Sequence, residues 1–240
     1  MRPAYRIQAY WQGRRARRDE IAAQLWQFVG ALPWASPRLR ALVPHSKEGE
    51  LLPPLESAAQ AESLLAHWTV RWRTGGVEHT SYQVPLVLGG VDAPAVRCEL
   101  VAGLEAPAVE GLWVPNRLSL TVQADAPDGL AGRDVLLAML HAAVRVFDPD
   151  WGVVAIEGSP VLPRPLYSRG EPVAGWMTYL SRRFPLAGLA VSEPSAVYSV
   201  GEQGYLVISY AEAPRADSAA QRAATAGVHH AMRAAGIVTA

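Results

Sequence analysis

Asp148-Pro149-Asp150-Trp151-Gly152-Val153-Val154 is the stretch that decides the fold, because it joins a helix to a strand. The preceding residues 133–147 place apolar side chains at helical spacing, and Pro149 ends that helix because a proline restricts the backbone of the residue before it. Residues 152–156 are uniformly apolar, as expected of a central strand. The stretch therefore predicts a long amphipathic helix that turns directly into a buried strand.

On either side of this junction, the spacing of apolar residues predicts further elements. Pro85 would confine its strand to a sheet edge or an extended loop, because proline cannot donate to a β-ladder. Few helices among many strands, without regular alternation, predict an α+β fold: a single domain with a mainly antiparallel sheet packed with about three main helices. Helices are expected at 17–32, at 218–235 and, as a short one, at 56–66. Strands are expected at 5–11, 68–73, 83–88, 96–101, 118–124, 151–157 and 175–181, with a hairpin at 195–210.

The composition sets limits on the class of protein. The chain has 240 residues, of which 50% are hydrophobic, and we expect a single domain over residues 1–240 because no break in composition divides it. Its only cysteine, Cys98, has apolar neighbours, which predicts a buried thiol. We find no apolar run long enough to span a membrane and no signal peptide, so a cytoplasmic protein is expected.

The net charge is zero, which argues against direct binding of nucleic acid by bulk electrostatics. The charges are nevertheless unevenly placed: residues 1–40 hold eight arginines, and residues 90–134 hold seven acids, including Asp125, Asp128 and Asp134. The simpler interpretation is solvated surface charge. The alternative is a basic face and an acidic face, one of which steers a partner.

Motifs of metal, phosphate or nucleophilic chemistry are absent from the sequence. His229 and His230 are adjacent, so on a helix they point about 100° apart and cannot share one ion. Residues 129–132 precede a helix, but no Lys-Ser/Thr pair follows them as in a phosphate loop. We therefore predict no metal, no cofactor and no enzymatic activity.

Asp148 and Asp150 allow three interpretations. Two carboxylates one residue apart can shape the turn through backbone hydrogen bonds, contact a partner, or do acid–base work. The tryptophans allow two interpretations. Most tryptophans pack in a core, but an exposed one would be an interface hot spot. The residues predicted to bind a partner are Asp125, Asp128, Asp134, Asp148, Asp150, Trp151, Trp176 and Tyr179.

The order of motifs resembles the immunity protein 52 family of bacterial polymorphic toxin systems. The resemblance rests on Ala9-Tyr10-Trp11, on Asp148-Pro149-Asp150-Trp151-Gly152 and on Gly175-Trp176-Met177-Thr178-Tyr179-Leu180-Ser181, and it extends over about residues 5–238. It implies an α+β fold and a cytoplasmic antitoxin. It also implies a partner, a toxin with a restriction-endonuclease-like domain that is often delivered by a type VI secretion system.

Three functions follow as hypotheses. The first is an immunity protein that binds and neutralises a cognate toxin, and the acidic residues would then meet the basic groove of a nuclease. The second is a hydrolase or transferase with an unrecognised site. The third is an adaptor module that helps to load an effector.

Overall fold

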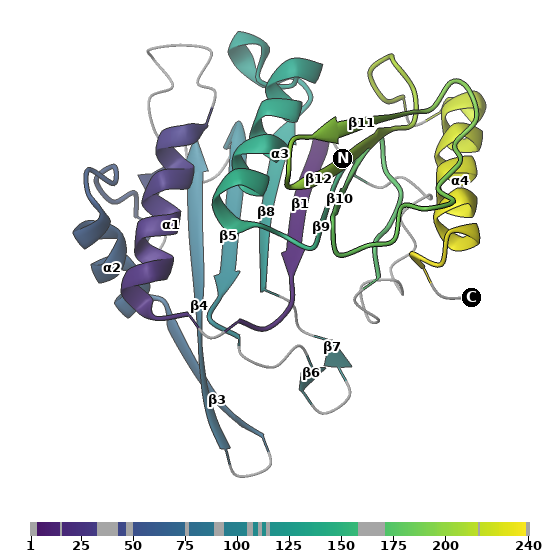
Figure 1. The fold of residues 1–240 in the computed structure, drawn as a ribbon. Helices are drawn as coiled ribbons and strands as arrows, with labels where there is room; N and C mark the ends of the chain where they lie inside the picture. The colour runs from purple at the N-terminus through teal and green to yellow at the C-terminus, as the bar shows by residue number, and fades with distance from the viewer. Residues whose placement is uncertain are drawn as a thin grey trace.

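A computed structural model gives the fold, and it describes residues 4–14, 16–32, 43–46, 50–74, 77–88, 94–104, 108–109, 112–113, 116–157, 171–215 and 217–238. A ten-stranded antiparallel sheet dominates it, in the order β11-β12-β10-β9-β1-β8-β5-β4-β2, with β3 also paired to β4 (Figure 1). The strands of this sheet are β1 (Ala4–Trp11), β2 (Val43–Pro44), β3 (Thr69–Thr74), β4 (Val77–Leu88), β5 (Val96–Ala102), β8 (Asn116–Gln123), β9 (Trp151–Ile156), β10 (Met177–Ser181), β11 (Ala196–Val200) and β12 (Gly204–Ile208). Two further short strands, β6 (Ala108–Val109) and β7 (Leu112–Trp113), pair only with each other.

Four α-helices pack on the sheet: α1 (Arg18–Ala31), α2 (Ala58–His67), α3 (Arg133–Phe147) and α4 (Ala219–Ala234). The predicted α+β class and antiparallel sheet are confirmed. The short helix predicted at 56–66 is α2, which begins where the Ser57 hydroxyl caps the Gln60 N–H. Ser218 caps α4 in the same way, and Gly236 ends it with a positive φ of 71°. None of the helices in the described ranges is long and apolar enough to cross a membrane.

The sheet has a large core on one face. In Figure 1, α1 and α3 lie across β4, β5, β8 and β1. Alternate residues of each strand point toward these helices, as the period of a strand requires. On β8 the inward residues are Leu118, Leu120 and Val122, all fully buried.

A second, smaller core occupies part of the opposite face. It joins strands β9, β10 and β12 to α4 and to residues 173–174. Trp151 and Val153 of β9 point into it, while Val154, between Val153 and Ala155, points into the first core. Strand β9 is thus covered on both faces, which explains why its sequence is uniformly apolar.

The prediction for Pro85 was wrong, because β4 lies inside the sheet. Pro85 pairs with Glu99 of β5, and β2 and β3 both pair along the other side of β4. The Gln83 N–H donates to the Trp68 carbonyl on that other side, and Pro85, two residues on, has its nitrogen on the same side. The nitrogen of Pro85 therefore points away from β5, so the ladder with β5 loses no hydrogen bond. On the other side, Pro85 lies between the residues of β4 that pair with β3 and those that pair with β2.

Candidate functional site

The Asp150 carboxylate ties together three segments that are far apart in the sequence. Its Oδ2 accepts a hydrogen bond of 2.7 Å from the Gln12 N–H, and its Oδ1 forms an ion pair with Arg183. The backbone of Asp150 also bonds to Tyr10 and to Ser181. Because only 11% of the side chain is exposed, the carboxylate depends on these donors.

Asp148 ends α3 in the left-handed conformation, with φ 43°. Its Oδ2 lies 3.0 Å from Nη2 of Arg183. Arg14 donates to the carbonyls of Phe147 (3.3 Å) and Asp148 (2.5 Å), which would otherwise be unpaired at the helix end. Of the three interpretations of the two aspartates, these contacts support turn-building.

A cavity of about 370 Å³ lies beside this junction, and Arg14, Asp150 and Arg183 are among its lining residues. The two carboxylates at the junction share the two guanidinium groups, so charge is largely balanced within it. We therefore interpret the junction as a structural element that holds three segments of the chain together, and we call it the lock.

Asp150→Ala is expected to lower the free energy of unfolding by about 1–3 kcal/mol, because the Gln12 N–H loses its acceptor in a buried place. Asp148→Asn is the matched control. Its side chain is 56% exposed and asparagine tolerates the left-handed conformation, so the change should stay below about 1 kcal/mol. Urea unfolding of the two variants measures the difference, and equal losses would contradict the assignment of the lock to Asp150.

The predicted aromatic contacts with a partner need correction, because the structure buries these side chains. Trp151 and Trp176 are each 1% exposed, and Tyr179 is not exposed at all. The Trp151 ring stacks on Tyr10 at a centroid distance of 4.3 Å, and the Trp176 Nε1–H donates to the carbonyl of Tyr210. All three are core residues, in agreement with the alternative interpretation of the aromatics.

The Tyr179 hydroxyl is part of this core. It donates to the carbonyl of Gln203 at 2.8 Å, and burial, together with the nearby charge of Asp148, raises the pKa of Tyr179 to about 12. The phenol therefore remains protonated at neutral pH and serves as a hydrogen-bond donor.

The glycines of the two motifs are explained by close packing. A Cβ on Gly152 would lie 3.0 Å from both the Gln8 carbonyl and the Leu140 side chain. A Cβ on Gly175 would lie 2.3 Å from the Val153 side chain. The glycines of the two motifs therefore maintain the fold, and their packing does not mark a partner-binding surface.

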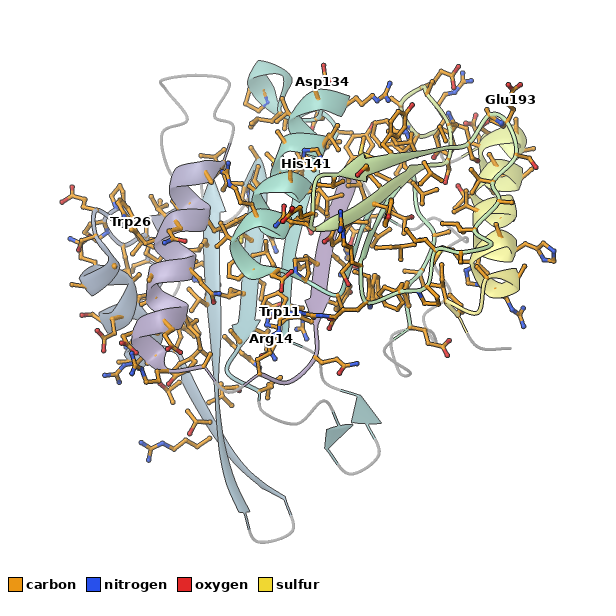
Figure 2. The ribbon with its side chains drawn as sticks, viewed as in Figure 1. Trp11, Arg14, Trp26, Asp134, His141 and Glu193 are labelled. Carbon is orange, nitrogen blue, oxygen red and sulfur yellow. The ribbon has the colours of Figure 1, made fainter. Side chains whose placement is uncertain are left out.

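The predicted acidic residues do not form one cluster. Asp125 and Asp134 are exposed around the beginning of α3, whereas Asp148 and Asp150 lie beyond its end. Figure 2 shows Asp134 at one end of α3 and Arg14 near the other. A helix of 15 residues separates the two groups by roughly 22 Å. The side chain of Asp128 lies outside the described residues, so partner contacts by Asp125, Asp128 and Asp134 stay predictions.

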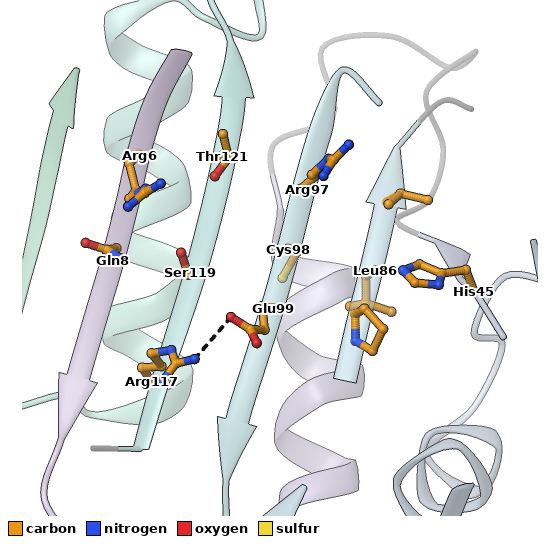
Figure 3. Close-up of a pocket in the computed structure, with 12 residues that line it drawn as sticks. Arg6, Gln8, His45, Leu86, Arg97, Cys98, Glu99, Arg117, Ser119 and Thr121 are labelled. Atoms are coloured by element: carbon orange, nitrogen blue, oxygen red, sulfur yellow. Dashed lines mark hydrogen bonds and ion pairs between the residues drawn. The ribbon is translucent and has the colours of Figure 1, made fainter. Parts of the chain in front are cut away.

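The sheet has a polar face, and no motif in the sequence predicts a site there. Opposite α1 and α3, the strands β1, β8, β5 and β4 form one side of a groove of about 670 Å³ (Figure 3). We call this surface the open sheet face. The residues that define it are Arg6, Gln8, Pro85, Val87, Arg97, Glu99, Arg117, Ser119 and Thr121.

The strand register sets the pattern of the open sheet face. Arg6 of β1 and Arg97 of β5 both pair with Thr121 of β8, so two arginines flank one hydroxyl. In the next row on this face, Gln8 and Glu99 both pair with Ser119. The signal in the sequence is the alternation of polar and apolar residues over 117–122, which matches the alternating burial of β8.

Cys98 is almost fully buried in the first core, at 3% exposure, and burial raises the pKa of its thiol. Because the thiolate is the reactive form, we expect the folded protein not to react with a thiol reagent such as DTNB. One thiol should react after unfolding in guanidinium. Rapid reaction of the folded protein would contradict this placement of Cys98.

A metal site is not found in the described part of the chain, where no three His, Cys, Asp or Glu side chains come together. His141 is exposed on α3, and His230 is exposed while its neighbour His229 is half-buried on α4. Burial, with the nearby charge of Arg233 as a second cause, lowers the pKa of His229, which favours its neutral form.

Comparison with known proteins shows a shared fold. The chain matches no protein-family model and none of the curated proteins. Among solved structures, it is similar to the T6SS protein PA0821 of Pseudomonas aeruginosa, with a TM-score of 0.58, 13% sequence identity, and coverage of 98% of this chain and 76% of that one. At 13% identity the likeness establishes the fold alone, and no family model confirms the resemblance to immunity protein 52.

Proposed function

We propose that this chain is a cytoplasmic immunity protein that binds and neutralises a cognate toxin of a type VI secretion system. The observation that carries the proposal is the likeness to a T6SS protein, which extends over 98% of the chain. The resemblance of the Asp148–Gly152 and Gly175–Ser181 motifs to immunity protein 52 supports the same system from the sequence. From that resemblance, we propose that the toxin carries a restriction-endonuclease-like domain.

The proposed action is stoichiometric binding without catalysis and without a cofactor. An inhibitor of this kind needs an accessible surface, and the structure offers the open sheet face, which lines a groove of about 670 Å³. The carboxylates that could do acid–base work, Asp148 and Asp150, are instead held by arginines at a turn.

Co-expression tests the proposal. The proposal expects a toxin gene next to the gene for this chain, and that gene is induced in a bacterial host with and without the chain. We expect the chain to restore growth and to co-purify with the toxin. Cell death despite comparable expression of both proteins would overturn the proposal.

The same experiment distinguishes the adaptor hypothesis, which the T6SS likeness also fits. An adaptor would co-purify with the effector but leave the producing cell unprotected. An immunity protein must do both.

A further inference from the structure

The described helices leave the open sheet face bare because the fold distributes them unequally. Helix α4 covers β9, β10 and β12 on this side of the sheet, through Val228 and Met232. No helix among the described residues covers the same side of β8, β5 and β4, and Figure 3 shows the helices behind these strands. The polar side chains of the open sheet face, apart from the buried Gln8, are thus partly or fully exposed to solvent.

The charges on this surface are partly paired. Arg117 lies 3.3 Å from Glu99 across neighbouring strands, and Arg6 pairs with Glu157. Arg97 is exposed and forms no ion pair with any described residue. Counting Glu157, which lies outside the defined face but pairs with Arg6, three arginines meet two glutamates. The net charge of +1 that results is concentrated at Arg97.

We infer that the open sheet face is the docking surface for an acidic segment of the protein partner, and that Arg97 receives one of its carboxylates. This inference rests on the proposed function, in which the partner is the toxin. The guanidinium of Arg97 can bind a carboxylate through two parallel hydrogen bonds. Thr121, beside Arg97, and Ser119 in the next row offer hydroxyls to polar groups of the same segment.

The charge pattern favours a protein segment over nucleic acid. Binding of a phosphate backbone depends on several uncompensated cations, whereas this surface has one. Glu99, in the middle of the face, would lie against a continuous phosphate backbone, whereas a peptide can place one carboxylate at Arg97 and a backbone N–H at Glu99. Pro85 of β4, which is half-buried, adds an apolar group at the margin, and a mixture of apolar and polar groups is typical of a protein interface.

Arg97→Glu tests the inference most sharply. The dissociation constant for the purified toxin-like protein, with its nuclease site inactivated, should rise about tenfold or more, mostly through a slower association rate. Arg145→Glu is the matched control, because it makes the same charge change on the exposed surface of α3, on the opposite side of the sheet. Its binding should stay within about twofold of the wild type.

A steric variant keeps the test independent of charge. Ser119→Trp should also weaken binding about tenfold or more if the partner covers the middle of the face. Thermal melting shows whether each variant is folded. Should Arg97→Glu fail to fold, the smaller change Arg97→Gln replaces it, with an expected three- to tenfold loss.

The outcomes separate the two proposals. If the wild-type chain does not bind the toxin-like protein, the proposed function fails. If it binds, and both Arg97→Glu and Ser119→Trp are folded and bind equally well, the function stands and this docking surface is overturned. Tight binding of the wild-type chain to a fluorescent DNA duplex, lost in Arg97→Glu, would also overturn the assignment to a protein segment.

Discussion

Trp151→Ala is expected to lower the free energy of unfolding by about 3–5 kcal/mol, a large part of the stability of an ordinary domain. The indole is 1% exposed and stacks on Tyr10, in the core between β9 and α4. Alanine would leave a cavity there, and the sheet cannot close it without moving α4. Urea unfolding followed by circular dichroism measures the loss.

Tyr198→Ala provides the control, because Tyr198 is 51% exposed on the edge strand β11. Its loss should cost no more than about 0.5 kcal/mol. A folded Trp151→Ala protein with near wild-type stability that no longer binds the toxin would reverse our interpretation and make Trp151 a contact residue.

Gly204→Ala is expected to destabilise the fold by about 3 kcal/mol, the upper part of the usual range for an over-packed site. A Cβ at this position would lie 2.2 Å from the Leu180 carbonyl oxygen and 2.9 Å from the Cα of Ser181. Both obstacles are backbone atoms, so strands β10 and β12 must separate where Ser181 pairs with Gly204.

Gly227→Ala is the opposite control. Gly227 lies inside α4, and a Cβ there would meet nothing within 4 Å. Alanine should therefore stabilise the protein by about 0.5–1 kcal/mol, since glycine is a poor helix former. Thermal melting of the two variants should move in opposite directions, and a shift of the same sign in both would contradict the packing described for Gly204.

Local signals predicted much of the fold. The apolar spacing of residues 133–147 and the proline after them gave the bounds of α3, and the helix expected at 218–235 is α4. Strand β4 was predicted too short because its first half, from Val77, is defined by pairing with β3. Pairing between strands depends on the whole sheet, so a short stretch of sequence does not reveal which strand lies beside it.

The site residues were harder to predict for the same reason. Asp150 meets Gln12, which is 138 residues away, and Arg183, which is 33 residues away, so its structural role emerges only after folding. Tryptophan is common both in protein cores and at the centres of interfaces, so only the burial of Trp151 and Trp176 identifies them as core residues. The open sheet face needs the register of four strands to bring Arg6, Thr121 and Arg97 into one row.

A titration of toxin activity tests the central claim, that this chain neutralises its target by stoichiometric binding. The purified toxin-like nuclease is held at a fixed concentration well above the dissociation constant, and cleavage of a DNA duplex is measured as the chain is added. We predict that activity falls linearly and ends at a fixed molar ratio of the two proteins. Full activity at a severalfold excess of the chain, or inactivation of many toxin molecules by each molecule of the chain, would contradict the claim.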